Sequence, residues 1–93
     1  MNKPNPIKPN HEETIRKAFA MANTYRQSGH IKLAENVYNK ILEIDSEHPD
    51  ALHMAGVIAR QNGKYDLAAN FIKSAIRIAP ERAAYHISQQ GYF

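Results

Sequence analysis

The side chains in this sequence that are able to do chemistry are its histidines. The chain has five histidines and no cysteine, so a disulfide and a thiolate metal site are both excluded. No two histidines are four residues apart, the spacing that presents two imidazoles on one side of a helix to zinc. We therefore expect no metal site, and we interpret His48, which precedes Pro49, as a helix-start residue. The histidines are His11, His30, His48, His53 and His86.

The acidic residues offer no better case for catalysis. Two groups stand out, Glu12–Glu13 and the alternating Glu43, Asp45 and Glu47. Both fall where helices are expected to begin or end, so they complement helix dipoles more readily than they form an acid–base pair. The four glycines form no phosphate-binding loop. We expect no catalytic residue and no cofactor, and we predict that the protein is not an enzyme.

Arginine recurs in a fixed context, which is the strongest signal in the chain. The run Arg26-Gln27-Ser28-Gly29 returns as Arg60-Gln61-Asn62-Gly63, at an offset of 34 positions. This period is typical of repeats built from a helix, a turn and a second helix. The same offset relates Leu33 to Leu67, Ala34 to Ala68, Asn36 to Asn70, Ile44 to Ile78 and Glu47 to Glu81.

Apolar residues spaced by three or four predict the helices that carry these arginines. The first helix is expected near His11, capped by Asn10 with Glu13 three residues later, after an extended arm over residues 1–10. It should end near Ser28–Gly29, because glycine takes the left-handed conformation at helix ends. Further helices are predicted from Ile31 to near Asp45, from Pro49 to Asn62–Gly63, and from about Tyr65 to Pro80. A fifth, short helix is predicted at about 83–90, with Tyr85 and Ile87 as its apolar candidates.

Small residues at matching positions indicate how the predicted helices pair. Ala34 and Ala68 are expected where the two helices of a hairpin approach closely, and Gly29 and Gly63 at the turn between them. Connections this short make consecutive helices antiparallel neighbours. Tyr38 and Ile72 are expected to fill the space between one hairpin and the next.

Residues 15–82 resemble two tandem tetratricopeptide repeats. The resemblance rests on the glycine, alanine and Pro80 positions named above, with Gly56 as a further small residue and Tyr25 as an aromatic one. It implies an all-α α-solenoid of antiparallel helical hairpins with about five helices. Repeat 1 would span about 11–48, repeat 2 about 49–82, and 83–93 would be a partial third repeat or a capping helix, all within one domain over 11–93.

The resemblance also implies a concave groove lined by the first helix of each hairpin. In the family this groove receives a peptide or a helix of a partner protein. The arginines among the carried-over contact residues favour an acidic partner segment, although exposed arginines often do no more than meet solvent. The predicted partner-binding residues are Arg16, Phe19, Asn23, Arg26, Gln27, His53, Val57, Arg60 and Gln61.

The expected function is therefore a protein-interaction scaffold. Two alternatives remain: the N-terminal part of a larger transferase-type enzyme that recruits its substrate, and a self-assembly module that associates through its open C-terminal helix. The net charge of +3 is spread among nine acidic residues, which argues against nucleic acid. No apolar run is long enough for a membrane span, and the first residues lack the apolar core of a secretory signal. A cytoplasmic location is expected.

Overall fold

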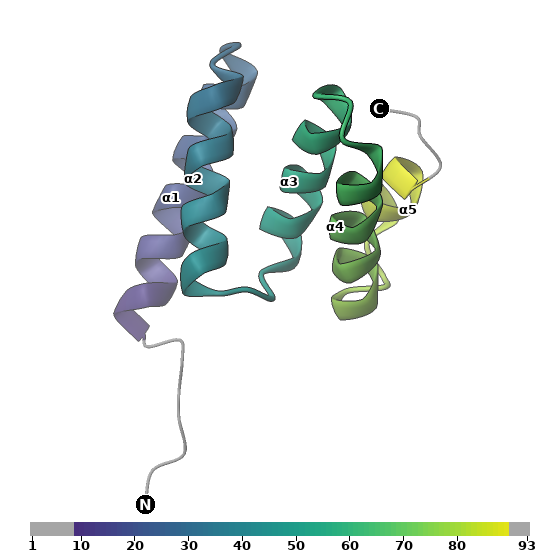
Figure 1. Ribbon diagram of the computed structural model, residues 1–93. Helices are drawn as coiled ribbons and strands as arrows, with labels where there is room; N and C mark the ends of the chain where they lie inside the picture. The colour runs from purple at the N-terminus through teal and green to yellow at the C-terminus, as the bar shows by residue number, and fades with distance from the viewer. Residues whose placement is uncertain (1–8, 90–93) are drawn as a thin grey trace, which may run out of the picture. The chain divides into compact units, whose positions relative to one another are not determined.

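The computed structural model describes residues 9–89, and over these residues it contains five helices and no strand (Figure 1). The chain divides after Ser46 into two compact units. The first unit holds two helices and the second holds three, so the fold is all-α. The helices are α1 Pro9–Gln27, α2 Ile31–Ile44, α3 Pro49–Gln61, α4 Tyr65–Ile78 and α5 Ala83–Gln89.

The predicted helices are confirmed, with one correction at the start of α1. Helix α4 begins and ends 34 positions after α2 does, and α5 begins 34 positions after α3 begins. Helix α1, however, begins at Pro9 instead of near His11. Asn10 therefore lies within the helix and not at its N-cap position. Proline suits the first turn of a helix because its missing N–H would have no partner there. The rest of the predicted arm lies outside the described residues.

The turn inside each hairpin has the same hydrogen-bonded geometry. Gly29 has a φ of 87° and Gly63 a φ of 79°, a region that only glycine enters without strain. In the second hairpin the N–H of Gly63 donates to the carbonyl of Arg60 at 2.9 Å, and that of Lys64 to the carbonyl of Ala59 at 2.8 Å. This pair of bonds is a Schellman motif, which satisfies carbonyls left open at the helix end.

Each hairpin is closed by small and aliphatic side chains on the facing sides of its helices. Figure 1 shows α2 running back beside α1, and α4 beside α3. Ala34 and Ala68 are buried in the second helix of each pair, as the small-residue pattern predicted. Burial of the aliphatic chains provides the favourable free energy of each unit. The buried apolar residues include Ile15, Ala22, Tyr38 and Ile41 in the first unit and Ala55, Ile58, Ile72 and Ala75 in the second.

Helix α3 packs tightly against α4 at Gly56. A Cβ atom added there would lie 2.7 Å from Ile72 Cγ1 and 3.1 Å from the carbonyl oxygen of Ala68. Both distances are shorter than ordinary van der Waals contact, and one of the two atoms belongs to the backbone. Glycine is therefore required at this position because of the spacing of the two helices, even though it weakens a helix intrinsically. Ile72, which the sequence placed between hairpins, thus contacts the facing helix of its own hairpin.

The short helix α5 packs on the second hairpin through Tyr85 and Ser88, which are 2% and 5% exposed. Of the two apolar candidates that the sequence offers in this segment, Tyr85 is buried, whereas half of the surface of Ile87 is exposed. Residues three apart share a helix face, so Tyr85 and Ser88 point inward together while Ile87 points away. A serine lies in the buried position because its hydroxyl finds a hydrogen-bond partner on α3.

We predict that Gly56→Ala destabilises the protein by about 1–2 kcal/mol, because the cost of overpacking exceeds the gain in helix propensity. Urea unfolding followed by circular dichroism measures the change. In an Ile72→Ala background the same substitution should cost less, since the atom nearest to the added Cβ is gone. Equal costs in the two backgrounds would show that the close approach does not explain the glycine.

Candidate partner-binding residues

Three of the predicted partner-binding residues of α1 lie around one tyrosine of α2. The Tyr38 side chain is fully buried, and its hydroxyl donates a hydrogen bond to Asn23 Oδ1. The same hydroxyl accepts a bond from Arg26 Nε at 3.4 Å. The Phe19 ring lies 5.7 Å from the Tyr38 ring, centroid to centroid. Tyr38 therefore fixes an aromatic ring, an amide and a guanidinium along one side of α1.

These contacts leave a particular set of polar atoms available in the first unit. The Tyr38 hydroxyl engages the oxygen of Asn23 and the Nε of Arg26. The Asn23 amide nitrogen and the terminal guanidinium nitrogens of Arg26 are all hydrogen-bond donors. Because both residues are half-buried, these donors are partly desolvated. Such a surface suits a ligand group that accepts hydrogen bonds.

The other two predicted residues of α1 are separate from this cluster. Arg16 is exposed, and one of its terminal nitrogens lies 3.3 Å from Glu13 Oε1. Exposed ion pairs of this kind contribute little to stability. Gln27 is exposed at the C-terminal end of the helix. Both side chains are accessible.

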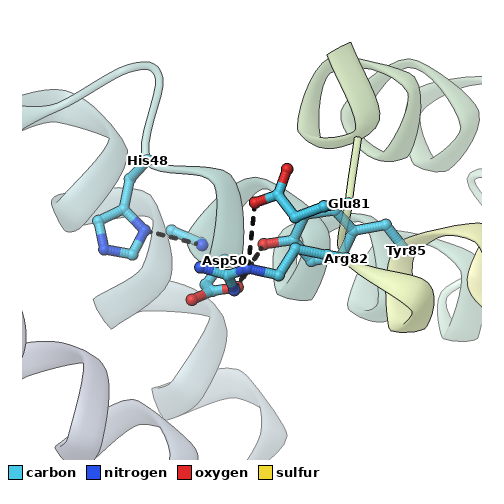
Figure 2. A network of polar contacts seen from close by, with 6 residues as sticks. His48, Asp50, Glu81, Arg82 and Tyr85 are labelled. Carbon is cyan, nitrogen blue, oxygen red and sulfur yellow. Dashed lines mark hydrogen bonds and ion pairs between the residues drawn. The ribbon is translucent and has the colours of Figure 1, made fainter. Parts of the chain in front are cut away.

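In the second unit, polar side chains join the first turn of α3 to α5 (Figure 2). Asp50 Oδ1 accepts a hydrogen bond from the Tyr85 hydroxyl and one from Arg82 Nη1 at 2.7 Å. Arg82 Nη1 also lies 3.3 Å from the Tyr85 hydroxyl oxygen. Beside them, His48 Nδ1 accepts from the backbone N–H of Ala51 at 3.0 Å, so His48 is the helix-start residue that the sequence predicted.

The predicted partner-binding residues of α3 have differing surroundings. The His53 ring nitrogen Nε2 lies 2.6 Å from Ser88 Oγ, and the ring packs 4.8 Å from Tyr85, so His53 contacts α5. Val57 is only 9% exposed, which leaves little of its surface open to a partner. Arg60 lies over the Tyr65 ring at 5.7 Å, and Gln61 is exposed.

The repeat explains why Val57 is buried while its counterpart Asn23 is polar. Asn23 and Val57 occupy equivalent positions of the two repeats, as do Tyr38 and Ile72. In the first hairpin the Asn23 amide oxygen accepts a hydrogen bond from the buried Tyr38 hydroxyl. In the second hairpin the tyrosine is replaced by isoleucine, so an amide would find no hydroxyl and a buried polar group without a partner is costly. An aliphatic residue is favoured there instead.

The Asp50 cluster shifts the pKa values of its members. Burial by itself would raise the pKa of Asp50, but the hydrogen bonds from Tyr85 and Arg82 outweigh it and lower that pKa below 3.8. Burial, with the adjacent carboxylate, raises the pKa of Tyr85. The hydrogen bond to Asp50 raises the pKa of Arg82. All three groups therefore keep one protonation state at neutral pH. The cluster holds α5 against the start of α3.

This cluster was not predicted from the sequence. Tyr85 was expected only as an apolar residue of the last helix, and Arg82 was given no role. The signal in the sequence was an acidic residue in the first turn of α3 and a basic residue just before α5, 32 positions apart. Neither local pattern indicates that the start of α3 lies next to the start of α5. Only the packing of α5 on the second hairpin brings them together.

Over residues 9–89, no three histidine or acidic side chains gather closely enough to hold a metal ion. Within the same range, no helix combines the length and hydropathy that a membrane crossing requires.

A family model described as tetratricopeptide repeat matches residues 20–90, which is more than half of the chain. The chain belongs to the tetratricopeptide repeat family. A search of curated proteins finds no match. The match confirms the resemblance seen in the turn glycines and contact alanines. Tetratricopeptide repeats serve in general as protein-interaction modules.

Asp50→Asn is expected to destabilise the second unit of this tetratricopeptide protein by about 1 kcal/mol at neutral pH, a figure that allows for the partial exposure of the carboxylate. Because the folded-state pKa of Asp50 is below its ordinary value of 3.8, the stabilisation is fully present above that value. It is lost as the pH falls through the folded-state pKa. Urea unfolding at neutral and acidic pH measures both effects.

Asp66→Asn is the matched control for this prediction. Asp66 is also in the first turn of its helix and is exposed, so the same charge is removed from a similar dipole position. We expect Asp66→Asn to change stability much less at neutral pH. A loss for Asp50→Asn that persists unchanged in acid would contradict the role of the ionised carboxylate.

Tyr38→Phe tests the cluster of the first unit. The substitution keeps the buried ring and removes the hydroxyl that holds Asn23 and Arg26, so we expect a loss of about 1–2 kcal/mol. The side-chain NMR signals of Asn23 Nδ2 and Arg26 Nε should shift and broaden. Tyr65→Phe, at a tyrosine that is 63% exposed, should change stability little. Unchanged signals at Asn23 and Arg26 would rule out the positioning role of Tyr38.

Proposed function

We propose that this protein is a non-catalytic scaffold of the cytoplasm that binds a segment of a partner protein along the first helix of each hairpin. The observation that carries the proposal is the donor cluster on α1. Phe19, Asn23 and Arg26 are held in fixed positions by one buried tyrosine, and a preorganised surface loses less entropy when a partner binds.

The chemistry of this cluster favours an acidic partner segment. The amide nitrogen of Asn23 and the terminal nitrogens of Arg26 offer donors from adjacent turns of α1, and a guanidinium can form two parallel bonds with a carboxylate. Phe19, half-buried one turn before Asn23, adds an apolar contact. A peptide that carries an aspartate or glutamate next to an apolar side chain would complement these three residues.

The second unit contributes a smaller set of contacts to the proposal. His53 is engaged with α5 and Val57 is buried, so the accessible candidates on α3 are Arg60 and Gln61 near its C-terminal end. Arg60 is held over the ring of Tyr65, which restricts its guanidinium and keeps its charge at the surface. We propose that Arg60 is the cationic contact of the second unit for an acidic segment.

Double charge reversal, Arg26→Glu with Arg60→Glu, tests the acidic preference. The full 93-residue chain is used to isolate partners from a lysate of its source cells, and the binding segment of each captured protein is then titrated as a peptide by calorimetry. We expect the double variant to lose about tenfold or more in affinity, because charge pairs in a binding site contribute about 1.5 kcal/mol and upward. Replacing glutamate by glutamine in the peptide should give a comparable loss.

The control carries the same change of net charge elsewhere. Lys40→Glu with Lys73→Glu reverses two exposed charges on α2 and α4, the second helices of the hairpins, and should leave peptide affinity nearly unchanged. Because Arg26 also contacts Tyr38, Gln27→Glu with Gln61→Glu provides a second test that adds negative charge without removing a tertiary contact. If both α1–α3 variants bind as the wild type does, the proposed surface is wrong.

A further inference from the structure

The turn between α3 and α4 contains a bond that can rearrange without an enzyme. Asn62 is exposed and is followed directly by Gly63. The backbone nitrogen of the residue after an asparagine can attack the side-chain amide carbon, and glycine hinders this attack least because it has no Cβ. We infer that Asn62 is a site of spontaneous deamidation, and that the turn geometry limits its rate.

The proposed reaction is balanced with water as the only co-reactant. The Gly63 nitrogen loses its proton and forms a bond to Asn62 Cγ, while the Cγ–Nδ2 bond breaks and ammonia leaves with that proton. The product is a five-membered succinimide ring. Water then opens one of the two C–N bonds of the ring, which yields either aspartate or isoaspartate at position 62.

The folded turn opposes the first step. The attacking nitrogen is engaged, since its N–H donates to the carbonyl of Arg60 at 2.9 Å. Asn62 has φ −88° and ψ 5°, and ring closure requires rotation about ψ to bring the Gly63 nitrogen against Cγ. That rotation breaks the bond to Arg60 and the bond from Lys64 to Ala59, which measures 2.8 Å. Deamidation of the folded protein therefore requires local opening of the turn.

The product would alter the surface assigned to partner binding. Aspartate at position 62 adds a negative charge at the C-terminal end of α3, where the helix dipole disfavours it, and two residues from Arg60. Isoaspartate also lengthens the backbone by one carbon, so the two bonds of the Schellman motif can no longer form together. One reaction thus changes both the charge and the geometry of this turn.

The first hairpin provides an internal control. Its turn has Ser28 in place of Asn62 before a glycine with nearly the same φ, and serine has no amide to attack. Asn62→Ser therefore gives the second turn the residue of the first. The reciprocal change, Ser28→Asn, places an Asn-Gly pair in the first turn, whose glycine N–H donates to the carbonyl of Arg26 at 3.1 Å.

The experiment follows deamidation of the full chain by peptide mapping and mass spectrometry at neutral pH and constant temperature. Samples are compared in buffer and in urea above the unfolding midpoint, with a short Gln-Asn-Gly-Lys peptide in both solvents to correct for the effect of urea. We expect Asn62 to react about tenfold or more slowly in the folded chain, because the rate follows the population of the open turn. Ser28→Asn should show a similar ratio at position 28, and Asn62→Ser should remove the signal at position 62.

Two results would overturn the inference. One is a rate for the folded chain equal to that in urea after correction, which would mean that the turn gives no protection. The other is an absence of aspartate and isoaspartate at position 62 in the unfolded chain while the short peptide reacts. Both readouts are independent of any partner, so they stand apart from the test of the scaffold function.

Discussion

The close approach of α3 to α4 at Gly56 is the constraint on which the second hairpin depends. At Gly56 there is no room for a single carbon between α3 and α4, because Ile72 and the Ala68 carbonyl already occupy that space. At this position the backbone of α3 packs directly against side-chain and backbone atoms of α4, as ridges fit into grooves. The connection must be correspondingly short, and the left-handed glycine of the Schellman motif provides it.

Much of this could be predicted from the sequence because the determining signals are local or strictly periodic. A turn glycine, a proline before or after a helix, and apolar residues at helical spacing indicate where α2, α3 and α4 lie and roughly where each one ends. The start of α1 was misplaced because Asn10 satisfies the local rule for a cap as well as Pro9 satisfies the rule for a first turn. Local rules cannot rank two adjacent signals that are both valid.

The Asp50–Arg82–Tyr85 cluster could not be predicted from the sequence for a different reason. Each residue has an ordinary local explanation: an acidic residue in a first helical turn, a basic residue in a linker, and an aromatic residue in an amphipathic helix. Their connection depends on where α5 is placed on the second hairpin, and that placement is a tertiary fact. The exposure of Ile87 could not be predicted for a further reason, because a helix as short as α5 does not let the periodicity define one face.

Close packing also decides where polar side chains can be placed, and the two hairpins solve this problem differently. Tyr38 is the large residue buried in the first hairpin, and its hydroxyl needs partners, which Asn23 and Arg26 of the facing helix provide. The equivalent positions in the second hairpin hold Val57 and Ile72, which match each other by their apolar character. Pairing a polar residue at one of these positions with an aliphatic residue at the other would leave a buried polar group without a partner. The two positions therefore have to change together. The repeat determines which positions of the two helices face each other. The residues at those positions determine that the first hairpin, and not the second, presents hydrogen-bond donors there.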